Sequence, residues 1–327
     1  MKKLLTVLLI AALIFGLAAC TKKADTAPTG KAAPALVRVG FAQCKADESD
    51  WRMANTRSML NTFNIPGFSL TLADSNNDAA RQVADVQGFI DQEYDYIVIA
   101  AVNMDGWDTV LRNAQRAGIP VILVDRNINA PEDLWTCYVG PDFEVEGKKA
   151  VDWMVKHFGG KPVNVVNLHG QLGSGAQVGR STALNKGVAQ HGWNLLAQQT
   201  GDWSTDVAKQ IMTSWIQQFG DQINCVYAEN DNMADGAIQA LREAGKKVGK
   251  ADGVAIISFD ANRPYLQMTL DGLINCNVEC NPLHGPRVKG IIDNLQKGIK
   301  PKKIEYIDEE AFFWDTITQA VINARQY

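Results

Sequence analysis

The sequence lacks the features that commonly identify proteins that bind nucleic acid, metal ions or ATP. It has no block of Lys or Arg and a formal net charge of −4, so we expect no basic surface for DNA or RNA. No GxxxxGK[ST] motif occurs in the chain. Only four histidines are present, without HxH or HxxxH spacing, and we interpret them as structural: His157, His169, His191 and His284. We therefore expect no metal, no cofactor and no nucleic-acid partner.

Cysteine is also scarce, and its spacing matches no zinc site. Five cysteines follow Cys20, namely Cys44, Cys137, Cys225, Cys276 and Cys280. Because five is an odd number, at least one thiol must stay unpaired. Cys276 and Cys280 lie four residues apart in an apparent strand, about 13 Å along it, which is too far for a disulfide between them. We expect several of these side chains to be small, buried and apolar.

The chain has one long uncharged run, residues 4–17, and it follows Lys2 and Lys3. As a helix this run would rise only about 21 Å, short of the roughly 30 Å of a bilayer core. Together with Leu17-Ala18-Ala19-Cys20 it resembles a bacterial lipoprotein signal, with residues 1–19 removed and Cys20 lipidated. The alternative is a soluble exported protein in which Cys20 is incidental. Either interpretation predicts a protein that works outside the cytoplasm, away from ATP and NADH.

The rest of the chain is long enough for two domains. Residues 20–34 are rich in Ala, Thr, Pro and Lys without apolar periodicity, which predicts a flexible tether. Beyond them, short apolar strands alternate with amphipathic helices. The first series has predicted strands at 37–41, 69–72, 96–100 and 121–124 and helices at 49–63, 78–90 and 106–117. The second has helices at 143–158, 177–191, 204–219 and 233–244 and strands at 163–168, 193–197, 225–228 and 254–259.

Two successive β-α-β series predict an α/β protein with two doubly wound parallel-sheet lobes. Ligands of such folds bind at the carboxyl ends of strands. Here these ends carry carboxylates, amides, guanidinium groups and indoles: Glu48, Trp51, Arg52, Trp107, Asp125, Arg126, Arg180, Trp203, Asn230 and Asp260. Planar polar groups bind sugar hydroxyls in pairs, and an indole covers the apolar face of a sugar ring. Taken singly, each has a structural explanation as a helix cap, a core residue or a surface ion pair.

With these residues the chain resembles the ribose/galactose group of periplasmic sugar-binding proteins, the receptors of ABC importers. The resemblance covers the chain beyond the tether. It is carried by Gly40-Phe41-Ala42-Gln43, Glu48-Ser49-Asp50-Trp51-Arg52, Gly118-Ile119-Pro120-Val121, Val124-Asp125-Arg126, Tyr227-Ala228-Glu229-Asn230-Asp231 and Phe259-Asp260. The first two segments and Gly106-Trp107 are similar to the galactofuranose-binding branch. Two departures, Asp50 where the branch usually has Gly and Trp203 where relatives carry Phe, leave arabinofuranose, a hexopyranose or a polyol open.

The resemblance implies three crossings between the lobes, near Gly140, Glu279 and Asp308. It implies an N-terminal lobe of residues 35–140 plus 281–307 and a C-terminal lobe of residues 141–280 plus 308–327. It also implies roles for single residues. Asp125 and Arg126 would hold adjacent hydroxyls, with Glu48 and Arg52 nearby and Trp51 over a ring face. On the other lobe Arg180, Asn230 and Asp260 would bind hydroxyls and Trp203 would stack, while Glu279 corresponds to a polar residue on a crossing.

Other classes of function fit less well. The loop 170–179 resembles a dinucleotide loop, but its glycines run GxGxxxG rather than GxGxxG. A glycosidase needs a proton-donating acid, whereas arginines flanking Glu48, Asp125 and Asp260 should keep these carboxylates ionised. A calcium loop at 231–236 fails because position 12 is Arg242. A transcriptional regulator of this fold would carry a DNA-binding segment where this chain has its signal. A sensory receptor that presents its ligand to a membrane protein remains open.

We therefore expect an exported, lipid-anchored and monomeric receptor in the periplasm or on the outer face of the cell membrane. It would close on a monosaccharide by hinge motion and deliver it to a permease. At this stage, Asp125→Ala is expected to abolish sugar binding while the fold stays intact.

Overall fold

A computed structural model of the chain describes residues 36–327. The predicted signal peptide (1–19), the lipidation site Cys20 and the tether (20–34) lie outside these residues. Among the helices of residues 36–327, none has the length and apolar character needed to cross a membrane.

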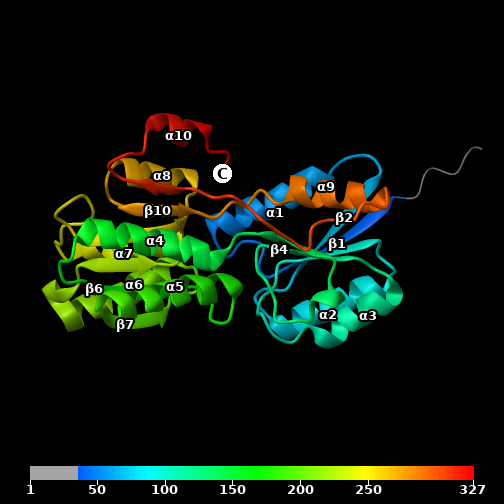
Figure 1. Ribbon diagram of the computed structural model, residues 1–327, viewed down its shortest axis with the longest axis horizontal. Helices are drawn as coiled ribbons and strands as arrows, with labels where there is room; N and C mark the ends of the chain where they lie inside the picture. The colour runs from blue at the N-terminus through cyan, green and yellow to red at the C-terminus, as the bar shows by residue number, and fades with distance from the viewer. Residues whose placement is uncertain (1–35) are drawn as a thin grey trace, which may run out of the picture. The chain divides into compact units, whose positions relative to one another are not determined.

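The first lobe is built on a six-stranded parallel sheet with the strand order β11-β5-β4-β3-β1-β2. In chain order the strands are β1 (Val37–Gln43), β2 (Phe68–Asp74), β3 (Tyr96–Ile99), β4 (Val121–Val124), β5 (Cys137–Gly140) and β11 (Ile304–Tyr306). Its helices are α1 (Asp50–Phe63), α2 (Ala79–Asp91), α3 (Asp108–Ala117) and α9 (Gly285–Gln296). Figure 1 shows α2 and α3 on one face of the sheet and α1 and α9 on the other, and each face has its own apolar core. Strands covered on both faces must be apolar throughout, as the buried Val121–Val124 is.

The second lobe repeats this arrangement with the strand order β12-β10-β9-β8-β6-β7. The strands are β6 (Asn164–His169), β7 (Asn194–Thr200), β8 (Cys225–Ala228), β9 (Ala255–Asp260), β10 (Cys276–Glu279) and β12 (Ala311–Phe313). The helices are α4 (Phe143–Phe158), α5 (Gly175–His191), α6 (Thr205–Phe219), α7 (Asp231–Glu243), α8 (Arg263–Leu270) and α10 (Gln319–Ala324). All neighbouring strands of this sheet are parallel except β10 and β12. The prediction of two doubly wound lobes is confirmed, with one antiparallel strand added.

Three short segments carry the chain from one sheet to the other. We call them the first crossing (141–142), the second crossing (280–284) and the third crossing (307–310). A backbone hydrogen bond links the end of β10, just before the second crossing, to the third crossing, because the amide of Glu279 donates to the carbonyl of Glu310 at 2.8 Å. These crossings are the places where a rotation of one lobe against the other requires the smallest change in structure.

Local signals in the sequence explain where the helices begin. The hydroxyl of Ser49 accepts a hydrogen bond from the amide of Arg52, and Asp78, Asp142, Ser174 and Ser204 cap α2, α4, α5 and α6 in the same way. The predicted cap at Ser204 is confirmed. Helix α3 ends at Gly118, whose left-handed backbone and following Pro120 stop the helix as the sequence indicated.

The five cysteines beyond Cys20 are all free and buried, which confirms that they serve as small apolar side chains. Burial raises the pKa of the Cys44 thiol to about 11 and that of Cys137 to about 12. Thiols held in the neutral form are poor nucleophiles, so these residues are unsuited to redox chemistry.

Close contact between α6 and α7 depends on Gly236. A Cβ atom at this position would lie 2.2 Å from the carbonyl oxygen of Thr205 and 2.9 Å from the amide nitrogen of Lys209. Both are backbone atoms and cannot turn away. In α2, by contrast, a Cβ atom on Gly88 would meet nothing nearer than the side chain of Gln92 at 4.0 Å.

We therefore expect opposite effects from the same substitution in two helices. Gly236→Ala should lower the free energy of unfolding by about 1–3 kcal/mol because it forces α6 and α7 apart. Gly88→Ala should raise it by about 0.5–1 kcal/mol because alanine favours the helix. Urea unfolding followed by circular dichroism measures both. Equal effects of the two substitutions would contradict the packing argument.

Candidate functional site

Nine of the eleven predicted binding residues line one pocket at the carboxyl ends of the strands. They come from the start of α1, the ends of β4 and β9, the inside of α5, the loop after β7 and the cap of α7: Glu48, Trp51, Arg52, Asp125, Arg126, Arg180, Trp203, Asn230 and Asp260. Both lobes contribute to the pocket. Its other lining residues are Ser49, Phe143, Ala176 and Cys280.

A network of buried charges forms the first-lobe side of the pocket. Arg52 donates from Nε to Glu48 Oε1 at 3.1 Å and from Nη2 to Asp125 Oδ2 at 2.5 Å. Arg126 Nη2 donates to the same Glu48 oxygen at 2.6 Å. Burial by itself would raise the pKa of Glu48 and of Asp125, but the two guanidinium groups outweigh it and lower both values. These two carboxylates stay ionised, as the sequence predicted.

The second-lobe side is organised around Arg180. Its Nε donates to Glu146 Oε2 at 2.7 Å, its Nη1 donates to the carbonyl of Glu229 at 2.5 Å, and its Nη2 lies 3.7 Å from Asp260 Oδ1. Burial raises the pKa of Asp260 well above its usual range. Attraction to Arg180 lowers this pKa, but repulsion from Asp231 and Glu146 raises it again. The expectation that a neighbouring arginine keeps Asp260 ionised is therefore wrong. A neutral Asp260 presents both a donor and an acceptor to a hydroxyl.

The two indoles of the pocket are held differently. Trp51 Nε1 donates to the carbonyl of Cys280 at 2.6 Å, which fixes its ring against the second crossing. Trp203 packs over Gly170, where a Cβ atom would lie 1.9 Å from the ring. The Arg126 guanidinium lies 5.7 Å from the centre of the Trp203 ring, within the range of a cation–π contact.

Several polar atoms of the pocket have no partner within the protein. Among the described residues, the buried Glu48 Oε2, Arg126 Nε and Trp203 Nε1 make no hydrogen bond. Three pocket residues also have left-handed backbone, with φ of 62° at Asp125, 62° at Trp203 and 102° at Asp260. Unpaired buried polar atoms and strained backbone cost stability, and both concentrate at functional sites. These atoms are available to a polar ligand.

The pocket is nearly closed in this structure. The space between its side chains is about 20 Å³, room for about one water molecule. A wider depression of about 670 Å³ adjoins it and shares Glu48, Ser49 and Trp203. A ligand larger than water must therefore enter while the lobes are apart.

Contacts across the mouth of the pocket hold it shut. Asp50 Oδ2 accepts hydrogen bonds from Tyr265 Oη at 2.9 Å and from Asn232 Nδ2 at 3.2 Å. The amide of Met104 donates to the carbonyl of Gly173 at 3.2 Å. Asp50, at the start of α1, therefore connects the first lobe to α7 and α8 of the second.

Two predicted residues lie elsewhere. Trp107 is 1% exposed inside the first-lobe core, and its Nε1 donates to the carbonyl of Asn103. Glu279 faces the end of the chain, where Arg325 and Tyr327 donate to its Oε1 at 2.5 and 2.8 Å. Trp107 shows that a position after a strand does not determine whether a side chain faces the cleft. Glu279, which the resemblance implied to lie on a crossing, is the last residue of β10.

The glycine-rich loop has a packing explanation instead of a nucleotide-binding one. A Cβ atom on Gly175 would lie 2.3 Å from Asn127 Oδ1, and one on Gly179 would lie 2.5 Å from Phe143 Cβ. Small residues let α5 approach the first lobe and α4. Phe143 and Glu146 were missed because the strand that precedes them, β5, was not among the predicted strands, although the helix that contains them was predicted correctly.

Comparison with known proteins agrees with this geometry. Residues 40–282 match the family model described as "Periplasmic binding protein domain". The chain is similar to galactofuranose-binding protein YtfQ of Escherichia coli (strain K12), with 34% identity over 297 residues, 89% of this chain and 92% of that protein. It is also similar to fructose import binding protein FruE of Bifidobacterium longum (strain NCC 2705), at 29% identity over 98% of this chain and 97% of the relative.

Solved structures have the same fold. The binding protein of the arabinose ABC transporter from Shewanella sp. ANA-3, bound to arabinofuranose, superposes with a TM-score of 0.82 at 32% identity and covers 88% of this chain and 95% of its own. A Mycobacterium smegmatis protein in complex with β-D-fucofuranose gives a TM-score of 0.81 at 35% identity, covering 89% and 93%.

The buried pair of Arg52 and Asp125 changes one expectation from the sequence. Asp125→Ala leaves Arg52 with one fewer buried partner, and breaking a buried pair costs about 3–5 kcal/mol. We therefore expect this variant to lose stability by about that amount as well as ligand binding. Asp108→Ala, which removes a half-exposed partner of Arg112, should cost under about 1 kcal/mol. Urea unfolding compares them, and equal stability of the two variants would show that the pair is not important for the fold.

Proposed function

The chain belongs to the periplasmic binding protein family and has its type I fold, and from this premise we propose that it is the sugar receptor of an ABC importer. A member of this family binds its ligand without transforming it, so the chain is a binding protein and not an enzyme. The observation that carries the proposal is the set of unpaired buried polar atoms in a pocket that two indoles line. Donors and an acceptor beside flat apolar rings suit a sugar, which has hydroxyls around its edge and C–H groups on its faces.

We infer that the sugar is a furanose, with galactofuranose as first choice. The relatives named for galactofuranose, arabinofuranose and β-D-fucofuranose support this class. The first-lobe network supports it as well, because Glu48 and Asp125 accept from hydroxyls while Arg126 donates. Trp203 lines the pocket where the resemblance implies a phenylalanine, and its larger indole narrows the slot for the ring. Xylitol and fructose are also ligands named for relatives, so polyols and ketoses belong among the comparison compounds.

The mechanism follows from the closed pocket. With the lobes apart, the sugar binds to one set of polar groups and then meets the other as the crossings rotate. Closure is favoured by contacts that exist only when both lobes touch the sugar, and by the bonds of Asp50 to Asn232 and Tyr265. The closed form then presents a defined surface to the permease. The receptor works in the periplasm or at the outer face of the cell membrane, held there through lipid on Cys20.

A thermal-shift panel tests the ligand. We expect galactofuranose to raise the melting temperature of the chain from Thr21 onward by about 10 °C at a thousand times its dissociation constant, because binding then contributes about 4 kcal/mol. Arabinofuranose, ribose, galactose, xylose, fructose and xylitol complete the panel. Asp125→Asn, which keeps an oxygen acceptor but lacks the charge, is the control and should give no shift. If no sugar of the panel shifts the melting temperature, the sugar proposal is refuted.

The lipid anchor is tested separately. In bacteria expressing the full chain, labelled palmitate should be incorporated and the protein should sediment with membranes. Cys20→Ser removes the thiol that carries the lipid, so label and membrane association should both disappear. Sedimentation that is unchanged in Cys20→Ser would contradict anchoring at this residue.

A further inference from the structure

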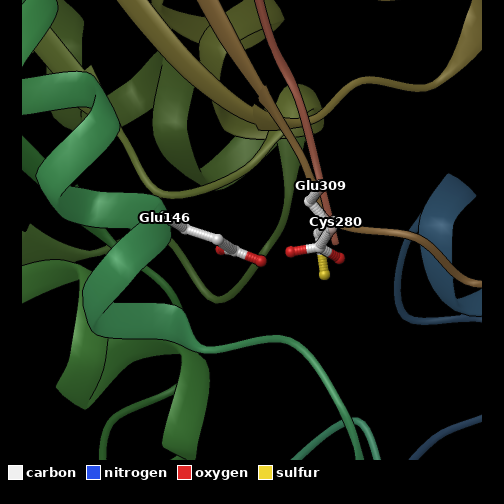
Figure 2. Close-up of side chains that lie close together, drawn as sticks. All are labelled: Glu146, Cys280 and Glu309. Carbon is white, nitrogen blue, oxygen red and sulfur yellow. The ribbon is translucent and has the colours of Figure 1, made fainter. Parts of the chain in front are cut away.

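A second buried cluster lies at the hinge, behind the sugar pocket. Glu146, Cys280 and Glu309 bring a carboxylate oxygen, a sulfur and a second carboxylate oxygen within 4.8 Å of one another. Figure 2 shows Glu146 reaching from α4 toward Glu309 and Cys280, which lie on neighbouring segments. Glu146 follows the first crossing, Cys280 belongs to the second and Glu309 to the third. The cluster therefore joins the second and third crossings to α4, the helix that follows the first crossing.

The charges around this cluster do not balance if every acid is ionised. The guanidinium group of Arg180 faces the cluster, and it already contacts the carboxyl groups of Glu146 and Asp260. The Lys149 ammonium is directed to the main-chain carbonyl of Glu309 at 2.5 Å, and Glu279 is paired with Arg325. The remaining neighbours are the phenols of Tyr138 and Tyr227 and the Cys280 thiol, which are neutral. Because Asp260 is neutral, the carboxyl groups of Glu146 and Glu309 are left to share one guanidinium, so at least one of these two must hold a proton.

Hydrogen bonding indicates where that proton lies. Glu309 Oε1 accepts from the amide of Asn281 at 2.7 Å, while the buried Glu146 Oε1 has no hydrogen-bond partner among residues 36–327. A protonated Glu309 can donate to this oxygen and satisfy it. Burial, followed by repulsion from Glu146, raises the pKa of Glu309 to about 10, and burial raises that of Glu146. A metal cation fits less well, since it would sit beside the Arg180 guanidinium.

We propose that Glu146 and Glu309 share one proton at the hinge, and that this proton, taken up as the lobes close, makes sugar binding weaker as the pH rises. The second half of this inference rests on the proposed sugar-binding function. Glu146 lies on α4 and Glu309 on a crossing, so a rotation there separates and hydrates the pair, and each acid then ionises more easily. Glu146 also acts as a positioning residue, because it holds the Arg180 side chain that lines the pocket.

The first experiment needs no sugar. A native protein with a protonated Glu309 binds one more proton than its unfolded chain, in which this group ionises near its ordinary value of 4.5. The corresponding stability is fully present below pH 4.5 and is lost as the pH rises toward 10. Urea unfolding between pH 5 and 9 should show wild type releasing about one more proton than Glu309→Gln. Other acids with raised pKa, such as Glu229 and Asp231, contribute equally to both proteins.

The control is Glu310→Gln, whose side chain is adjacent in sequence but exposed, and it should titrate like wild type. If Glu309→Gln titrates like wild type, the shared proton is refuted. Should Glu309→Gln fail to fold, Glu146→Gln removes the other half of the pair and allows the same comparison. Zinc or manganese that stabilises wild type but not Glu309→Gln would mean that a cation occupies the cluster, and would overturn the proposal.

The second experiment measures binding of galactofuranose by calorimetry at pH 8 in phosphate and in Tris. The difference in heat between the buffers should correspond to uptake of up to about one proton, with affinity falling by up to about tenfold per pH unit. Glu309→Gln should bind with little dependence on pH. Equal proton uptake in wild type and Glu309→Gln would refute the coupling. Absence of any sugar binding would refute the proposed function instead, and the unfolding comparison would still decide whether the proton is shared.

Discussion

The pairing of buried charges is the constraint on which the rest of this structure depends. Arg52, Arg126 and Arg180 lie almost completely out of water, and each is tolerated there only because carboxylates or carbonyls face it. This pairing fixes the side chains before a ligand arrives. Because the partners of Arg52 come from the start of α1 and the end of β4, the network also joins elements far apart in the sequence. The polar site is thus part of what holds the first lobe together.

Much of the fold could be predicted because its elements are long or flanked by clear signals. The helix at 143–158 and the strands at 121–124 and 225–228 have the bounds expected from their apolar patterns. The sequence did not predict β11 and β12, because strands of three residues show no periodicity. Their place in the sheets is set by neighbours distant in the chain.

Part of the candidate site could be predicted because many of its residues directly follow a strand. Polar residues after strands led to Asp125, Arg126 and Asp260, which the structure brings together. The same rule failed for Trp107, whose indole turns into the core. It also gave no indication of Glu309, because a buried acid in a short crossing follows no motif. Its partner Glu146 lies 163 positions earlier in the chain (309 minus 146), and only the folded structure brings them into contact.

The contact between Gly170 and Trp203 links the shape of the sugar slot to a residue with no side chain. An indole at position 203 lies where any Cβ atom at position 170 would be, so the two positions cannot vary independently. A lineage that keeps a smaller ring at position 203 is free to place alanine at position 170. A lineage with tryptophan at position 203 cannot place alanine at position 170. A residue larger than glycine at position 170 is therefore possible only after Trp203 has been replaced by a smaller side chain.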